Sequence, residues 1–95
     1  MIKHIVIYKL KNRNESEKEK LCEKFNSMRG KIPYLKSLIA GSDILNSERS
    51  YDVALICEFE SLEDLNKYKT HEVHLPIVDY VKSVAEISHS VDFEF

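Results

Sequence analysis

The hydrophobic positions of the chain follow two periods, one typical of strands and one typical of helices. Ile2–Leu10 and Tyr51–Phe59 are rich in β-branched and aromatic residues and lack Gly and Pro, which favours strands. Leu35–Ile44 alternates more weakly, and Ala85–Phe95 alternates strictly. We therefore expect the last strand to bury one face, which carries Ile87, His89, Val91, Phe93 and Phe95. In Tyr51–Phe59 the odd-numbered residues form the apolar face, and Asp52 falls on the other.

Helix signals separate the expected strands. Ser16 with Glu19, and Ser61 with Asp64, have the spacing of the capping box, in which the serine hydroxyl caps the first turn. Gly30 is the expected stop of the first helix. The buried face of that helix is expected to carry Leu21, Phe25 and Met28. Its solvated face is expected to carry Lys18, Glu19, Lys20, Glu23 and Lys24.

The second helix should end near Lys69, because Pro76 disfavours helix at the residue before it. A third short helix then follows. The resulting order, β-α-β-β-α-(α)-β, predicts one ferredoxin-like α+β domain over residues 1–95, with an antiparallel four-stranded sheet and helices on one face. Ile5 and Ile7 would lie on the other face, which needs a cover. A second copy of the same sheet is the simplest cover, so we expect a homodimer with a barrel-like interior.

Composition narrows the possible partners. The chain has 95 residues, with 14 Lys and Arg against 16 Asp and Glu, and a formal net charge of −2. With this balance the chain has no excess of positive charge of the kind that binds nucleic acid or an anionic membrane. No apolar run reaches the roughly 20 residues that span a bilayer, and no signal peptide is visible. Cys22 and Cys57 lack the CxxC spacing. We expect a cytoplasmic protein.

Histidines supply most of the candidate chemistry, because imidazole titrates near neutral pH. His4 and His89 lie in strands, where taken alone each is more simply interpreted as a packed or partly exposed core histidine. His71 and His74 are one residue too close for the zinc-protease motif, so a metal site would need His4 or Glu72 as a third ligand, and we predict none. Tyr68 could form an acid–base pair with His71 or His74, or could simply pack between helix and sheet.

Several segments together resemble the stress-responsive A/B-barrel (Dabb) family. They are Ile2–Leu10, Gly30-Lys31-Ile32-Pro33 with Leu35, Ser47–Leu55, Phe59–Leu65, Tyr68-Lys69-Thr70-His71 to His74, and Val91-Asp92-Phe93. The resemblance covers essentially the whole chain, in order. It implies a ferredoxin-like protomer that pairs into a dimeric α/β barrel, without by itself implying an activity.

One plant member of the family, a polyketide cyclase that needs no cofactor, provides the sharpest functional lead. Its cavity and catalytic residues match His4, Tyr68 and His74, which implies that His74 is a general base and that Tyr68 orients it or polarises the substrate. Two positions depart from the pattern, because Val53 replaces a cavity histidine and Glu72 replaces a proline. The expected pocket residues are Val6, Tyr8, Val53, Leu55 and His71.

Four functions stay open at this point. The first is a non-catalytic protein that binds a small ligand in the barrel cavity. The second is a cofactor-free cyclase or lyase that acts on a small carbonyl compound through His74 and Tyr68. The third is a cofactor-free monooxygenase or a haem-degrading relative, which rests on fold analogy alone. The fourth is a purely structural role.

Overall fold

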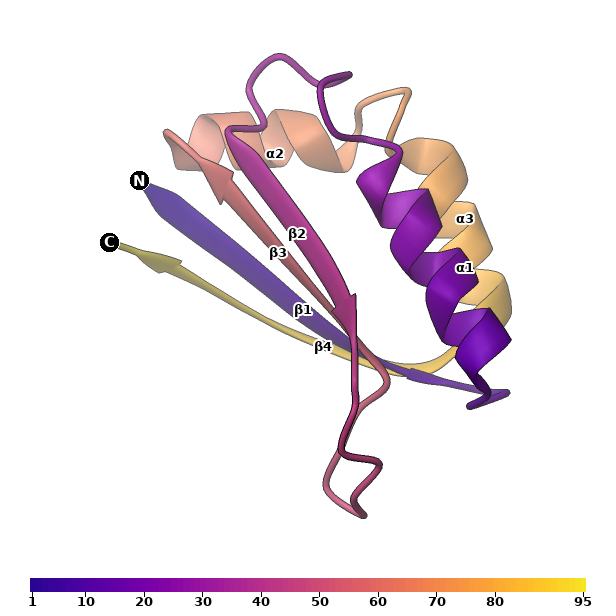
Figure 1. Cartoon of the computed structure of the whole chain (residues 1–95). Coiled ribbons are helices and arrows are strands. Elements are labelled where there is room, and N and C mark those ends of the chain that lie inside the picture. The colour runs from indigo at the N-terminus through magenta and orange to yellow at the C-terminus, as the bar shows by residue number, and fades with distance from the viewer.

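Four antiparallel strands form one sheet in the order β2–β3–β1–β4, with every helix on the same side (Figure 1). The computed structural model describes residues 1–95. Its elements are β1 Ile2–Leu10, α1 Glu15–Asn26, β2 Ser37–Ser42, β3 Val53–Phe59, α2 Leu62–Lys69, α3 Leu75–Val84 and β4 Ala85–Glu94. The ferredoxin-like α+β fold expected from the sequence is confirmed, and β2 is shorter at both ends than expected.

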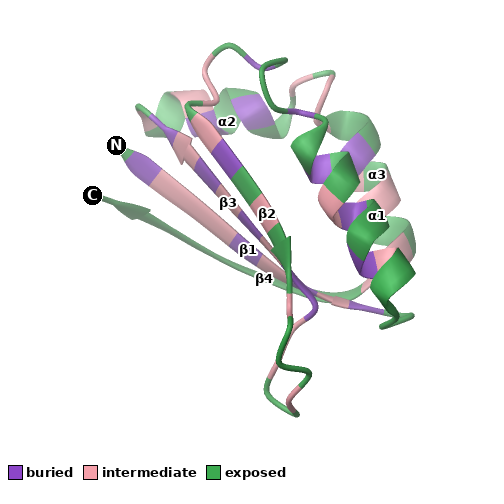
Figure 2. Ribbon diagram, viewed as in Figure 1, coloured by how far each residue is buried: buried purple, intermediate pink, exposed green.

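The core lies between the helices and one face of the sheet (Figure 2). Strand register explains its composition, because Val6 and Tyr8 of β1 stand opposite Leu55 and Val53 of β3. Their side chains therefore share one face, against which α1 packs Phe25; the rings of Tyr8 and Phe25 lie 5.2 Å apart. The cluster contains 16 buried residues, a single core of the kind expected for a domain of this size.

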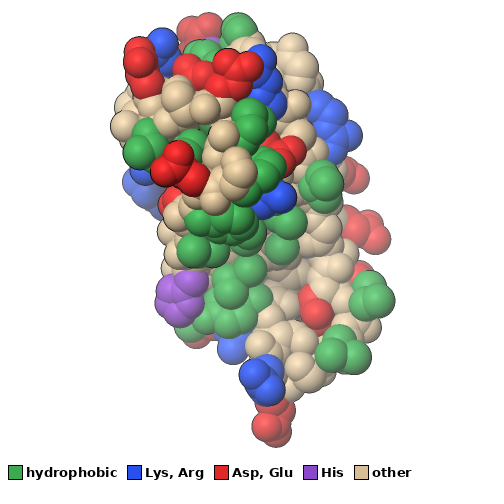
Figure 3. All heavy atoms as spheres, turned by 90° about the vertical axis from the view of Figure 1, so that its left-hand side faces the viewer, with side chains coloured by type: hydrophobic (Ala, Val, Ile, Leu, Met, Phe, Trp, Pro, Cys, Tyr) green, Lys and Arg blue, Asp and Glu red, His purple; other side chains and the backbone are tan.

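The opposite face of the sheet is apolar and uncovered; we call it the open face. Figure 3 shows hydrophobic side chains gathered over its middle. It carries Ile5 and Ile7 of β1, Ile39 of β2, Ala54 and Ile56 of β3, and Ile87, His89, Val91 and Phe93 of β4.

The expectation that β4 buries its apolar face is wrong for the single chain. Val91 is 54% exposed and Phe93 44%. The alternation is as expected, but β4 is an edge strand, and its apolar face points away from the helices. His89 is likewise exposed, with its Nδ1 atom 2.9 Å from the Tyr51 hydroxyl.

Two signals for the ends of α1 fall at the wrong residue. Asn14, in extended conformation, is the N-cap, and its side chain accepts a hydrogen bond from the Glu17 amide at 2.8 Å, so Ser16 lies inside the first turn. The helix ends at Asn26, four residues before Gly30. Gly30 instead occupies a left-handed turn, with a φ of 78°, between the helix and β2.

Lys18, which was expected on the solvated face of the first helix, is buried, and so is Asp52. Lys18 is 1% exposed, and its ammonium donates to the Asp43 carbonyl and the Asn46 side chain of the β2–β3 loop. Asp52 is 2% exposed and accepts hydrogen bonds from the Leu10 amide and the Arg13 guanidinium. The hydrophobic periodicity of a helix or strand could not predict these contacts, because they join the β2–β3 loop to residues far from it in the sequence.

Candidate functional site

His4, Tyr68 and His74 meet on the helix side of the sheet. β1 directs His4 toward the helices, because His4 stands opposite Cys57 on the buried face of β3. α2 presents Tyr68 from its inner side, where its ring lies 5.1 Å from that of Phe59. His74 immediately precedes α3. The Tyr68 ring centre is 4.1 Å from that of His74 and 6.1 Å from that of His4, so the three side chains form one cluster.

The Tyr68 hydroxyl is buried and has no strong hydrogen-bond partner, since only the Cys57 thiol lies beside it. Tyr68 is only 1% exposed. Burial raises the pKa of the phenol well above its ordinary value, and the neighbouring Cys57 thiol raises it further. Burial likewise raises the pKa of Cys57 to about 12, so this thiol is neutral and a weak hydrogen-bond partner. A buried polar group without a strong partner costs free energy, which marks Tyr68 as a candidate functional residue.

His74 carries the features of a general base. Burial lowers its pKa, and the facing imidazoles of His4 and His71 lower it further, against a hydrogen bond to the Lys69 carbonyl that raises it. That bond, 3.1 Å long, fixes the tautomer, because a carbonyl accepts and Nδ1 must therefore carry the proton. The unprotonated Nε2 atom of the neutral imidazole is then the proton acceptor.

Asp92 is a member of the cluster that the sequence did not single out. Its carboxylate accepts a hydrogen bond from Nδ1 of His4, which stands directly opposite it in the register of β1 and β4. The bond fixes the orientation of the His4 ring. Strict alternation in Ala85–Phe95 predicts which residues share a face with Asp92. It does not predict which strand pairs with β4, and so it could not place Asp92 beside His4.

The five expected pocket residues are core or turn residues. Val6, Tyr8, Val53 and Leu55 are buried between sheet and helices. His71 follows α2, where its Nδ1 accepts the Val73 amide at 3.0 Å and its ring packs edge-on against Tyr34. None of them separates His4, Tyr68 and His74 from one another. Their role as pocket walls stays a prediction.

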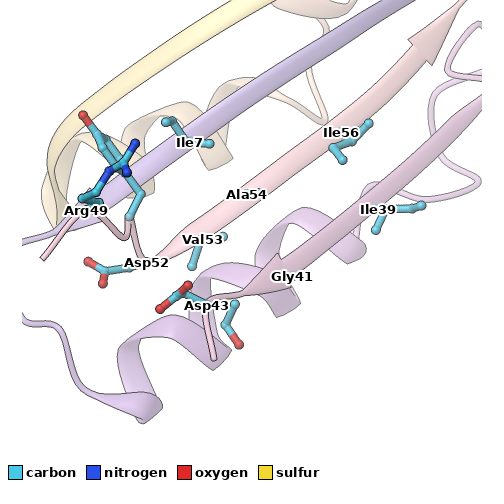
Figure 4. Close-up of a pocket in the computed structure, with 11 residues that line it drawn as sticks. Ile7, Ile39, Gly41, Asp43, Arg49, Asp52, Val53, Ala54 and Ile56 are labelled. Atoms are coloured by element: carbon cyan, nitrogen blue, oxygen red, sulfur yellow. The ribbon is translucent and has the colours of Figure 1, made fainter. Parts of the chain in front are cut away.

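The larger hollows of the surface lie apart from Tyr68. One of about 480 Å³ opens on the open face, over Gly41 and Ala54, which pair across β2 and β3 and leave the floor without bulky side chains (Figure 4). Another, of about 220 Å³, lies on the helix side between α2 and β4 and reaches Asp92. A ligand could therefore approach His4 past Asp92, and must displace side chains to reach the Tyr68 hydroxyl.

Two further observations concern metal ions and membranes. No group of three or more His, Cys, Asp or Glu side chains is arranged to hold a metal ion. No helix has both the length and the apolar character needed to cross a bilayer.

Comparison with known proteins gives a consistent result. The sequence profile of the stress responsive A/B barrel domain matches residues 2–95. Olivetolic acid cyclase from Cannabis sativa is 28% identical over 88 residues, which cover 90% of this chain and 87% of that protein. A dimeric ferredoxin-like protein of unknown function from Bacteroides fragilis superposes with a TM-score of 0.84 at 27% identity, covering 99% of this chain and 95% of that one. Hydroxynitrile lyase from Passiflora edulis superposes with a TM-score of 0.81 at 14% identity, covering 97% and 90%, which shows a shared fold alone.

Proposed function

Because the chain belongs to the stress responsive A/B barrel domain family, we propose that it binds a small carbonyl compound at His4, Tyr68 and His74 and acts as a cofactor-free lyase or cyclase. The observation that carries the proposal is the unpartnered Tyr68 hydroxyl, buried beside an imidazole whose pKa is lowered.

The two side chains have complementary protonation states. Nε2 of His74 takes a proton from the carbon next to the carbonyl, and negative charge develops on the carbonyl oxygen. The Tyr68 hydroxyl, kept protonated by its raised pKa, donates a hydrogen bond to that oxygen. Because Tyr68 is buried away from water, this bond is stronger than it would be in solvent.

One relative supports a reaction of this class. Olivetolic acid cyclase is by its name a cyclase. Two residues set this chain apart from the cyclase pattern. Val53 is buried at the position of a polar cavity residue, and Glu72 is exposed in the turn before α3. The first makes this site less polar than that of the plant enzyme, which favours a more apolar substrate.

Binding without catalysis is the second candidate function. The observation that favours it is the apolar hollow of about 480 Å³ on the open face, a volume within the usual range for a ligand pocket. Period-2 alternation puts this hollow and the His74 cluster on opposite sides of the sheet, so the two candidate functions predict ligands on different faces.

The same open face leads us to infer a homodimer. Ile39, Val91 and Phe93 are each more than 40% exposed, and a second sheet packed face to face would remove them from water. The dimeric state of the Bacteroides fragilis relative supports this inference.

Both cysteines are free thiols, which supports the expected location in the reducing cytoplasm.

Proton exchange at a ketone tests the catalytic role without knowledge of the natural substrate. Acetone and acetophenone in D₂O lose their α-proton NMR signals as a base exchanges them. We expect the protein to accelerate this loss, His74→Ala to return it to the buffer rate, and Tyr68→Phe to slow it at least tenfold. His89→Gln, on the open face, is the matched control. Equal acceleration by His74→Ala would exclude the proposed base. Shifts of the Gly41 and Ala54 amides on the open face on ketone addition, without exchange, would favour binding alone.

A further inference from the structure

We propose that the β2–β3 arm, residues 43–52, docks its tip onto a second copy of this chain. The arm extends past the end of the sheet and away from the helices (Figure 1). Its tip carries Ile44 and Leu45, which are 94% and 75% exposed and are the two most exposed large hydrophobic side chains of the protein. The proposal rests on the homodimer inferred above and assigns to it a contact that the sheet faces alone do not provide.

The arm is held in place by two buried charges, one on each side of its base. The ammonium of Lys18 reaches the Asp43 carbonyl and the Asn46 side chain, at 3.4 and 3.1 Å. Asp52 binds the Leu10 amide at 2.8 Å and the Arg13 guanidinium at 2.9 Å. Burying charge is costly, and here it fixes a loop whose tip packs on nothing in its own chain.

Such preorganisation suits a contact surface, because a segment that is already ordered loses little conformational entropy when it binds. Asn46 adds to the fixed shape, since it holds a left-handed backbone with a φ of 55° and its amide donates to the Asp43 carboxylate at 2.7 Å. The apolar tip is therefore presented outward rather than folded back onto the sheet.

The position of the arm selects a second copy as the partner. Its base adjoins the open face, because Asp43, Arg49 and Tyr51 line the same hollow as Ile7 and Ile56 (Figure 4). When two such sheets pack face to face, a segment that projects beyond one sheet meets the other chain. In a two-fold dimer the contact forms twice, so each copy offers one tip and receives one.

The charges around the tip are compatible with self-association. Glu48 and Arg49 on the arm, and Lys9 on the open face, form no ion pair within their own chain. Each copy thus carries unpaired groups of both signs near the proposed contact, and a two-fold arrangement can place opposite charges together.

The test compares two double variants by sedimentation velocity and equilibrium. In Ile44→Ser/Leu45→Ser the tip becomes polar, whereas Leu62→Ser/Leu75→Ser alters two leucines that are 60% and 48% exposed on the helix side. Both tip residues are large apolar side chains whose burial at the contact would favour association, so we expect the arm variant to raise the dimer dissociation constant at least about tenfold. The control variant should change it less than about twofold, within the usual range for surface substitutions.

The possible outcomes separate the two inferences. A wild-type dimer with an unchanged dissociation constant in the arm variant would overturn the docking of the tip and leave the dimer intact. A wild-type chain that stays monomeric at millimolar concentration would overturn both. Because the tip residues bury little in their own chain, the arm variant should keep the far-ultraviolet circular dichroism and the amide NMR pattern of the folded protein.

Discussion

Replacing Tyr68 by phenylalanine should make the protein more stable while it removes a functional group. The ring is 1% exposed and packs against Phe59 and His74, and phenylalanine keeps those contacts. Only the hydroxyl is lost, and its one neighbouring partner is the Cys57 thiol, which bonds weakly. In most proteins the same substitution at a buried tyrosine breaks a hydrogen bond and destabilises the fold.

The magnitude follows from the cost of an unpaired buried polar group, about 1–3 kcal/mol. Because the Cys57 thiol beside the hydroxyl offsets a little of that cost, we expect Tyr68→Phe to raise the free energy of unfolding by about 1 kcal/mol. For a domain of this size, that gain raises Tm by about 4–8 °C. Urea unfolding followed by circular dichroism gives the free energy directly, and calorimetry gives Tm.

Tyr80→Phe is the matched control, because Tyr80 is half-buried on α3 and phenylalanine keeps its contact with the Lys24 ammonium. Its effect should stay within about 0.5 kcal/mol. A loss of more than about 1 kcal/mol in Tyr68→Phe would refute the reasoning, since it would mean that the hydroxyl is well bonded and that Tyr68 is a structural residue.

Three further predictions address the charged groups. Asp52→Ala should destabilise the chain by about 1–3 kcal/mol in urea unfolding, because it leaves the Leu10 amide without its buried acceptor, whereas the Arg13 guanidinium, whose side chain is 43% exposed, can turn to water; an unchanged midpoint would contradict the burial of the Asp52 carboxylate. The folded pKa of His74 lies below its unfolded value of about 6.5, so its contribution to stability is full above pH 6.5 and is lost as the pH falls from there through the lower folded pKa; His74→Gln, which can still donate to the Lys69 carbonyl, should flatten this part of the profile. Asp92→Asn should weaken ketone exchange at least threefold, since it loosens the His4 ring, and His4→Ala should remove any further effect of that substitution.

The sequence predicted the features that depend on local period and missed those that depend on distant contacts. Alternation placed His4 on the same face as Val6, and the resemblance to the family grouped it with Tyr68 and His74; the structure brings these three together. The buried state of Lys18 and Asp52 was missed, because helix period and strand alternation describe an element and not the loop that packs on it. Asp92 was missed for a related reason, since the register of β4 against β1 follows from the whole sheet.

The same limit explains the exposed side of β4. The pattern of Ile87, Val91 and Phe93 correctly indicated an apolar face, but pattern alone does not say what covers it. Within one chain nothing does, because all helices lie on the other side.

Strand β1 separates the helix side of the sheet from the open face, and the two sides are divided by a single layer of backbone. Its even-numbered residues, among them His4, serve the proposed reaction, and its odd-numbered residues, among them Ile5 and Ile7, serve the proposed assembly. Neighbouring positions of β1 thus face different sides of the sheet, so a substitution at one position changes the side chains of only one side. A single-residue insertion in this strand would exchange the two sets and should abolish both at once.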